Sequence, residues 1–290
     1  MLNTESEGQQ RRPSDETTAF RMKEVFEQQA IISQWDRDYY HPIALWLYDR
    51  AISDMLRIMG AGPGSTILDA GCGPGGHSIR AARAGLRVCA VDISENMLSH
   101  ARHRSEKEGL QDSISFHRGD LTNLDFPDSS FQYAFSWGVI THIPAAEMAL
   151  DELARVIKPG GRLALYLING AAPDIGVKSL ARSLLRRKLA GLEHLPLGDR
   201  MWSDKDGGKL CVWAFNAKAL TAYLGGKSLR LLKRRLGELS ELQRHLSGHS
   251  RRSFLHLNNV AYRLNLPPSL GVGNLFVFEK DQGRANAHIG

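Results

Sequence analysis

Two kinds of hydrophobic pattern follow one another along the chain. Within residues 20–60, apolar side chains recur every three or four positions, as at Ile43, Trp46 and Leu56, and this spacing predicts amphipathic helices. Gly60 is the predicted C-cap of the second helix. The first part of the chain is therefore expected to be helical.

From Thr66 onward, short apolar runs alternate with helical patterns. Strands alternating with helices of about 10–15 residues imply right-handed crossovers and a parallel sheet. The predicted strands are residues 66–70, 87–93, 113–120, 130–138 and 162–168, and the predicted helices are residues 75–85, 94–109 and 145–161.

The pattern is less regular after residue 170. The leucines between residues 229 and 246 have helical spacing, but a sheet of this kind needs a sixth strand, so its first part is assigned to a strand and the rest to a helix. The predictions here are a helix within 176–192, a loop-like stretch at 196–209, a helix at 216–226, a strand at 229–235 and a last strand at 273–280.

These elements divide the chain into six parts. The polar ends are expected to be disordered tails, and the segment before the sheet is expected to be a helical lid. The parts are a tail at 1–19, the lid at 20–62, a ligand-binding core at 63–169, a helical cap insertion at 170–212, the completion of the sheet at 213–281 and a tail at 282–290.

Composition narrows the class of protein. The chain has 290 residues, 42% of them hydrophobic, which is enough for a substantial core. No apolar run approaches the roughly 18–20 residues of a membrane span, and the start lacks a secretory signal, so a cytoplasmic location is expected. The three cysteines form no C-x-x-C pair, and no metal site is predicted.

Positive charge is concentrated in the last part of the chain. Residues 170–290 carry 20 basic and 9 acidic side chains, whereas the whole chain has a net charge of only +6. One interpretation is a solvated basic surface, and the other is contact with an anionic substrate, a nucleic acid or an anionic membrane surface. The basic helix within 173–190 accordingly has two interpretations, a lid over the sheet or an interfacial helix.

A glycine turn is the clearest candidate site. The sequence ILDAGCGPGGHS, at 67–78, places Gly71, Gly73 and Gly76 between a strand and a helix, where backbone N–H groups can approach a nucleotide. Asp92, at the end of the next strand, can accept hydrogen bonds from ribose hydroxyls.

Dinucleotides and S-adenosylmethionine both fit such a turn, and Asp69 distinguishes between them. A carboxylate beside a pyrophosphate is unfavourable, whereas a carboxylate can pair with the ammonium group of S-adenosylmethionine. The alternative role for Asp69 is to cap the turn by holding its N–H groups, and the two roles can coexist.

Four ordered motifs between residues 66 and 165 resemble those of class I S-adenosylmethionine-dependent methyltransferases. Besides the glycine turn, they are VCAVDISENML, FHRGDLTNLDFPDSSFQYAFS and LARVIKPGGRLAL. The resemblance implies an α/β fold, with a seven-stranded Rossmann-like methyltransferase sheet that is mostly parallel and has an antiparallel last strand. It also implies S-adenosyl-L-methionine as cofactor and S-adenosyl-L-homocysteine as product.

The resemblance assigns cofactor-binding roles to further residues. Asp92 would hold the ribose, with Ile93 and Met97 against the adenine, while Asp120 would accept from the adenine amino group and the Leu121 backbone would contact the ring. Trp137 is a candidate wall of the cofactor pocket or a core residue.

Catalytic residues are harder to identify, because methyl transfer from a sulfonium needs mainly positioning, and a base only for a protonated acceptor. His142, after the fourth strand, is a candidate base or an orienting residue for the next helix. Tyr40 lies in an aromatic segment that either closes over the cofactor or pins a helix to the sheet.

The predicted function is methyl transfer to a small molecule, at oxygen or alternatively at nitrogen or carbon. The alternatives are a methyltransferase acting on RNA or on a lipid-linked anionic substrate, and a non-catalytic protein that binds the cofactor. Two classes of nucleic-acid methyltransferase are disfavoured because their sequence motifs are absent. The segment FSWGVITHIP stands where enzymes that methylate the adenine amino group have their motif, and no cysteine follows a proline as in enzymes that methylate cytosine C5.

Overall fold

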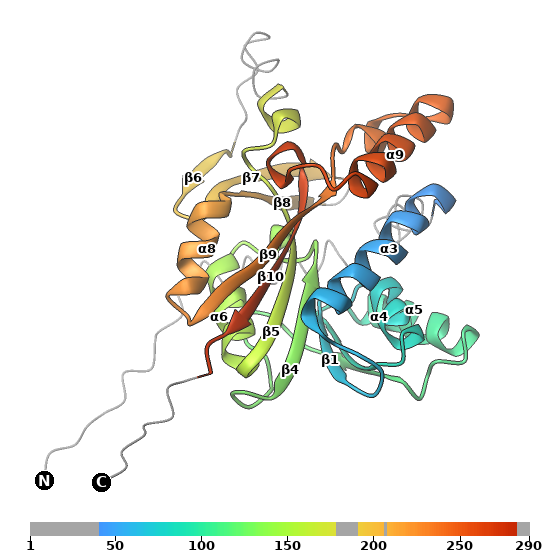
Figure 1. Cartoon of the computed structure of the whole chain (residues 1–290), viewed down its shortest axis with the longest axis vertical. Coiled ribbons are helices and arrows are strands. Elements are labelled where there is room, and N and C mark those ends of the chain that lie inside the picture. Colours follow the sequence, from blue (N-terminus) through green and yellow to red (C-terminus); the bar gives the residue numbers. More distant parts are fainter. Residues whose placement is uncertain (1–40, 178–190, 206–207, 283–290) are drawn as a thin grey trace, which may run out of the picture.

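A seven-stranded sheet forms the centre of the protein (Figure 1). The computed structural model describes residues 41–177, 191–205 and 208–282. The strand order is β3-β2-β1-β4-β5-β10-β9, and β10 runs antiparallel to the other six strands. The strands are β1 Thr66–Ala70, β2 Arg87–Asp92, β3 Ile114–Arg118, β4 Phe131–Trp137, β5 Ile157–Ile168, β9 Leu229–Glu238 and β10 Gly273–Lys280.

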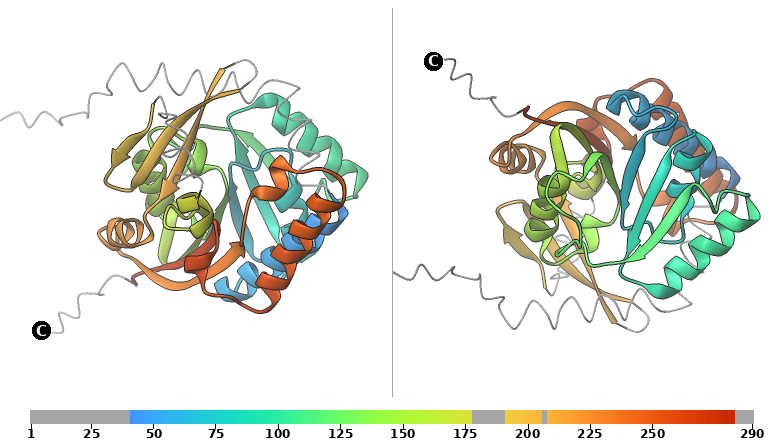
Figure 2. Two further views of the ribbon diagram at one scale, coloured as in Figure 1. Left: turned by 90° about the horizontal axis from the view of Figure 1, so that it is seen from above. Right: turned by 90° about the horizontal axis from the view of Figure 1, so that it is seen from below.

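Helices cover both faces of this sheet, and each face has its own hydrophobic cluster (Figure 2). One cluster joins the sheet to α3 (Pro42–Met59), α4 (Gly76–Arg83), α5 (Glu95–Lys107) and α9 (Gly248–Arg263). The other joins it to α6 (Ala146–Val156) and α8 (Ala217–Gly225). In the described ranges, no helix is both long and apolar enough to cross a membrane.

The sequence pattern predicted this core well, including the uncertain strand near residue 229. Gly60 ends α3 in the left-handed conformation with φ of 64°, as expected of a C-cap. The predicted helix at 145–161 is wrong in its last residues, because α6 ends at Val156 and Ile157 already pairs with Phe131 of β4. Pro159 disfavours the helical conformation for the residue before it.

The cap insertion differs from the prediction. Residues 173–177 are helical, but the stretch after residue 192, instead of a loop, is a three-stranded antiparallel sheet made of β6 (Glu193–Leu195), β7 (Gly198–Lys205) and β8 (Gly208–Phe215). Residues 178–190, where a basic helix was expected, lie outside the described residues. Two residues, Asp206-Gly207, link β7 to β8, and Asp-Gly is a hairpin dipeptide that could have predicted the pair.

The small sheet is attached to the loop that follows β4. The indole Nε1 of Trp213 donates to the Ile143 carbonyl at 2.9 Å, and Nη1 of Arg200 donates to the Pro144 carbonyl at 2.8 Å. The guanidinium of Arg200 also lies over the Trp213 ring, 5.5 Å from its centroid. The cap is therefore fixed beside the carboxyl end of β4.

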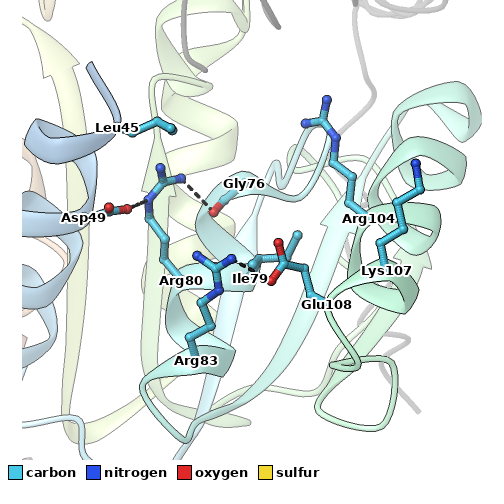
Figure 3. Close-up of a pocket in the computed structure, with 9 residues that line it drawn as sticks. All are labelled: Leu45, Asp49, Gly76, Ile79, Arg80, Arg83, Arg104, Lys107 and Glu108. Atoms are coloured by element: carbon cyan, nitrogen blue, oxygen red, sulfur yellow. Dashed lines mark hydrogen bonds and ion pairs between the residues drawn. The ribbon is translucent and has the colours of Figure 1, made fainter. Parts of the chain in front are cut away.

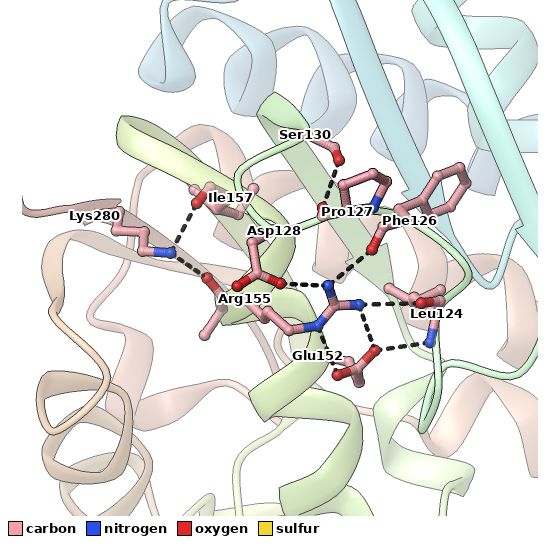
Figure 4. A network of polar contacts seen from close by, with 10 residues as sticks. Leu124, Phe126, Pro127, Asp128, Ser130, Glu152, Arg155, Ile157 and Lys280 are labelled. Atoms are coloured by element: carbon pink, nitrogen blue, oxygen red, sulfur yellow. Dashed lines mark hydrogen bonds and ion pairs between the residues drawn. The ribbon is translucent and has the colours of Figure 1, made fainter.

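Arg155 organises the long connection between β3 and β4 (Figure 4). Its guanidinium donates to both carboxylate oxygens of Glu152, to Asp128 and to the carbonyls of Leu124 and Phe126, all at 2.8–3.0 Å. These hydrogen bonds, led by those to Glu152, hold the pKa of Arg155 above its ordinary value. One side chain thus fixes the loop that carries the predicted adenine contacts.

Replacing Arg155 with alanine should lower the free energy of unfolding by about 2–3 kcal/mol, because several charge-assisted hydrogen bonds are lost together. Chemical denaturation of the purified protein measures this difference. The matched control is Arg102→Ala, which removes an exposed ion pair with Glu95 and should cost less than about 1 kcal/mol. Equal losses for the two variants would contradict the organising role of Arg155.

Candidate functional site

The glycine turn lies at the carboxyl edge of the parallel strands and is held by the next strand. Gly73 N–H donates to Oδ2 of Asp92 at 2.8 Å, while Oδ1 of Asp92 accepts from Ser94 N–H at 3.0 Å. Gly71 has φ of 86°, and a Cβ there would lie 2.5 Å from both methyl groups of Val139. The turn therefore needs glycine both for its conformation and for its close packing.

A second glycine explains the start of the helix. Gly75, with φ of 83°, is the N-cap of α4, and Gly76 is its first helical residue. The N–H groups of this first turn are the ones available to a ligand. The structure thus places Gly71, Gly73 and Gly76 together, as predicted, and adds Gly75 as a position that requires positive φ.

Asp69 is the most distinctive group at this edge. Its residue is 1% exposed, and Oδ2 accepts from the hydroxyl of Ser78 at 2.5 Å. The other oxygen, Oδ1, is buried and has no hydrogen-bond partner among the described residues. A buried carboxylate oxygen without a donor is costly unless a ligand supplies one.

The electrostatics of Asp69 support the same interpretation. Burial, together with the nearby charge of Asp92, raises the pKa of Asp69 to about 7, although the Ser78 hydroxyl acts in the opposite direction. Burial likewise raises the pKa of Asp92. An ammonium group at Oδ1 would satisfy the carboxylate and favour its ionised form. The buried acceptor therefore fits the ammonium group of S-adenosylmethionine, and a ligand role for Asp69 is compatible with its hydrogen bond from Ser78.

The predicted adenine contacts follow β2 and β3. Ile93 is half-buried directly after β2, and Met97, on the first turn of α5, is 2% exposed. Oδ1 of Asp120 accepts from the backbone and the hydroxyl of Thr122, both at 2.8 Å, so one of its oxygens already orders the turn. Leu121 is buried beside it. These residues stand at neighbouring strand ends, as the sequence predicted.

Trp137 belongs to a row of aromatic rings across the strand ends. It stacks on Tyr166 of β5 with ring centroids 4.3 Å apart and contacts the His77 ring at 4.9 Å. His77 in turn meets Tyr48 of α3 edge-on at 5.7 Å. Burial and the charge of Arg80 keep the pKa of His77 well below its ordinary value, so its imidazole is neutral.

A buried carboxylate ends this row. Oε1 of Glu238, the last residue of β9, accepts from the Tyr48 hydroxyl at 3.0 Å. Glu238 is 4% exposed, and burial raises its pKa. The adjacent Gly237 packs against the Tyr166 ring, since any side chain there would collide with it. The sequence analysis missed Tyr48, His77, Tyr166 and Glu238.

The structure describes only one of the two candidate catalytic residues, His142. His142 is half-buried in the short helix η1 (Ile140–His142), and its Nδ1 lies 2.9 Å from the carbonyl oxygen of Cys211 in β8. A carbonyl accepts only, so Nδ1 carries the proton and the lone pair of the neutral ring is on Nε2. Tyr40 lies outside the described residues.

A basic cleft of about 460 Å³ abuts the glycine turn between α3, α4 and α5 (Figure 3). Arg80 donates from Nη1 to the Gly76 carbonyl at 2.9 Å and from Nε to Asp49 at 2.6 Å. Arg83 pairs with Glu108 at 2.6 Å. Because its arginines are engaged in these contacts, we interpret this cleft as a support for the turn.

Comparison with known proteins agrees with this geometry. Residues 67–161 match the family described as Methyltransferase domain. The chain is similar to the methyltransferase GfsG of Streptomyces halstedii, with 30% identity over 216 residues that cover 68% of this chain and 77% of that protein. It is also 38% identical over 104 residues to the sterol 24-C-methyltransferase of Eremothecium gossypii, covering 36% of this chain but only 28% of that enzyme.

Solved structures share the fold at lower identity. The cyclase SpnF has a TM-score of 0.54 and 18% identity, with 81% of each chain covered. Geranyl diphosphate C-methyltransferase from Streptomyces coelicolor A3(2) has a TM-score of 0.53 and 15% identity, with 80% of this chain and 78% of that chain covered. At such identities the likeness concerns the fold.

The affinity for S-adenosylmethionine should depend on pH through Asp69. Since its pKa is raised to about 7 and the ammonium pairs with the ionised form, affinity should fall about tenfold per pH unit below 7 and level off above it. Calorimetric titration across this range measures the effect.

Two variants of this site sharpen the measurement. Asp69→Asn should bind more weakly and lose the pH dependence, whereas Ser78→Ala should move the midpoint to higher pH, because the Ser78 hydroxyl stabilises the carboxylate. If the affinity of the unmodified protein did not change with pH and equalled that of Asp69→Asn, the assignment would be contradicted.

Proposed function

The chain belongs to the class I S-adenosylmethionine-dependent methyltransferases, and from this membership we propose that it transfers the methyl group to a hydroxyl oxygen of a small, largely apolar acceptor. The observation that carries the cofactor half of the proposal is the buried, unpartnered Oδ1 of Asp69 beside the glycine turn. Bound there, the cofactor supplies an electrophilic methyl group on sulfur.

The aromatic row supports an apolar acceptor. Trp137, Tyr166, His77 and Tyr48 form a row along the strand ends, with one carboxylate, Glu238, at the far end. Trp137, Tyr166 and Tyr48 are 7%, 8% and 4% exposed. Aromatic faces favour planar or hydrocarbon groups, and a carboxylate accepts a hydrogen bond from a hydroxyl.

The names of two relatives are consistent with this class. One is a sterol 24-C-methyltransferase, and another, from Amycolatopsis mediterranei, is a 27-O-demethylrifamycin SV methyltransferase with 37% identity over 103 residues. These names include methylation at both carbon and oxygen. We favour oxygen because His142 offers a base for a hydroxyl proton, which the neutral form can accept at Nε2.

Calorimetry with S-adenosylmethionine and S-adenosylhomocysteine tests the cofactor assignment. Both should bind with one site per chain, and NADH should not bind, because the Asp69 carboxylate disfavours its pyrophosphate. Binding of NADH without binding of either sulfur ligand would overturn the proposal. Product formation from methyl-labelled cofactor and a metabolite extract then tests the transfer itself.

His142→Gln separates a base from an orienting residue. A glutamine amide can still donate to the Cys211 carbonyl but cannot take up a proton, so kcat should fall by about 10²–10⁴-fold with cofactor affinity unchanged. His142→Ala should lose the tie to the cap as well. If His142→Gln keeps full turnover with the labelled cofactor while His142→Ala lowers thermal stability, His142 only orients the cap.

A further inference from the structure

Helix α9 carries an apolar strip on its solvent side. Leu257, Val260 and Leu264 are 45%, 49% and 67% exposed. At about 100° per residue these three positions fall within a sector of about 60° on the helix. The sector is distinct from the buried face, where Leu255, Ala261 and Tyr262 pack toward the sheet. The strip is therefore not part of the core contact.

A basic strip runs beside the apolar one. Arg252, His256 and Arg263 are exposed and fall within about 40° of one another on the neighbouring sector of the same helix. From residue 242 to residue 278 the chain contains four arginines and no aspartate or glutamate. Within the part of the chain that the structure describes, neither Arg252 nor Arg263 has a carboxylate partner.

A side chain of α3 extends this surface. The Arg263 guanidinium lies over the indole of Trp46 in α3, 4.3 Å from the ring centroid. Aliphatic groups, an indole and arginines in one surface are the composition of helices that lie in a membrane interface.

Helix α9 lies on the same side of the molecule as the candidate cofactor site. It follows the carboxyl end of β9, packs against α3 and stands at the same edge of the sheet as the cofactor turn (Figure 1). Asn259 of α9 donates to the Ile43 carbonyl of α3 at 3.2 Å, which fixes the two helices to each other.

We propose that the outer face of α9, with Leu257, Val260 and Leu264 beside Arg252 and Arg263, docks the protein on an anionic lipid surface. The aliphatic side chains enter the boundary between headgroups and acyl chains, and the arginines pair with lipid phosphates. The inference does not depend on the proposed function, because it concerns binding of the protein to lipid without cofactor or acceptor.

Co-sedimentation with vesicles tests the proposal. The full chain should sediment with vesicles of phosphatidylcholine mixed with phosphatidylglycerol, and much less with phosphatidylcholine alone. The triple variant Leu257→Gln, Val260→Gln, Leu264→Gln should reduce the bound fraction at least about tenfold, and added salt should weaken binding of the unmodified protein. These side chains are exposed, so thermal unfolding should change little.

Two arginine variants provide a matched comparison. Arg252→Gln on α9 and Arg102→Gln on α5 remove the same charge from exposed helical positions, and only the first should weaken vesicle binding. Equal effects of both, or no vesicle binding by the unmodified protein, would overturn the proposal. So would a dimer in sedimentation velocity that the triple variant abolishes, because the strip would then be an interface between two copies of the chain.

Discussion

Two carboxylates buried side by side at strand ends set the main constraint on this structure. Asp69 is the penultimate residue of β1 and Asp92 is the last residue of β2, and burial raises the pKa of both. Asp92 uses its oxygens to hold Gly73 and Ser94, whereas Asp69 retains one oxygen without a donor. The site therefore has uncompensated negative charge, which a cationic ligand would balance.

The remainder of the carboxyl edge is arranged around that ligand site. The cap is attached to the loop after β4 through His142, Ile143 and Pro144, and α3 is attached to β9 through Tyr48 and Glu238. A second tie from α3 runs through Asp54, which accepts from Arg235 at 2.6 Å and from Tyr262 at 3.0 Å. The aromatic row thus lies between elements that are fixed on both sides.

The sequence was sufficient for the sheet and for placing the candidate cofactor residues at one edge of it, because those residues lie at the ends of strands whose hydrophobic pattern is strong. Asp69, Asp92 and Asp120 were found by their positions, and parallel strands necessarily bring such positions to one edge. Glu238 was missed because it ends a strand whose leucines have helical spacing. Its contact with Tyr48 joins residues 190 positions apart, which no local pattern reveals.

The cap shows a second limit of predicting structure from the sequence. Four of the eight residues of β7 are charged and the strand lacks a clear alternation, so the stretch was typical of a loop. What makes these residues strands is pairing with one another and packing on the loop after β4, for example through Trp213, which is fully buried. Tertiary contacts decide such segments.

The most direct test of the account is the ionisation of Asp69 itself. A carbon-13 NMR titration of its side-chain carboxyl, assigned with Asp69→Asn, can be recorded with and without S-adenosylmethionine. The account predicts a pKa near 7 in the ligand-free protein and a value well below it in the complex, because the ammonium stabilises the carboxylate. A pKa that cofactor binding leaves unchanged would contradict it.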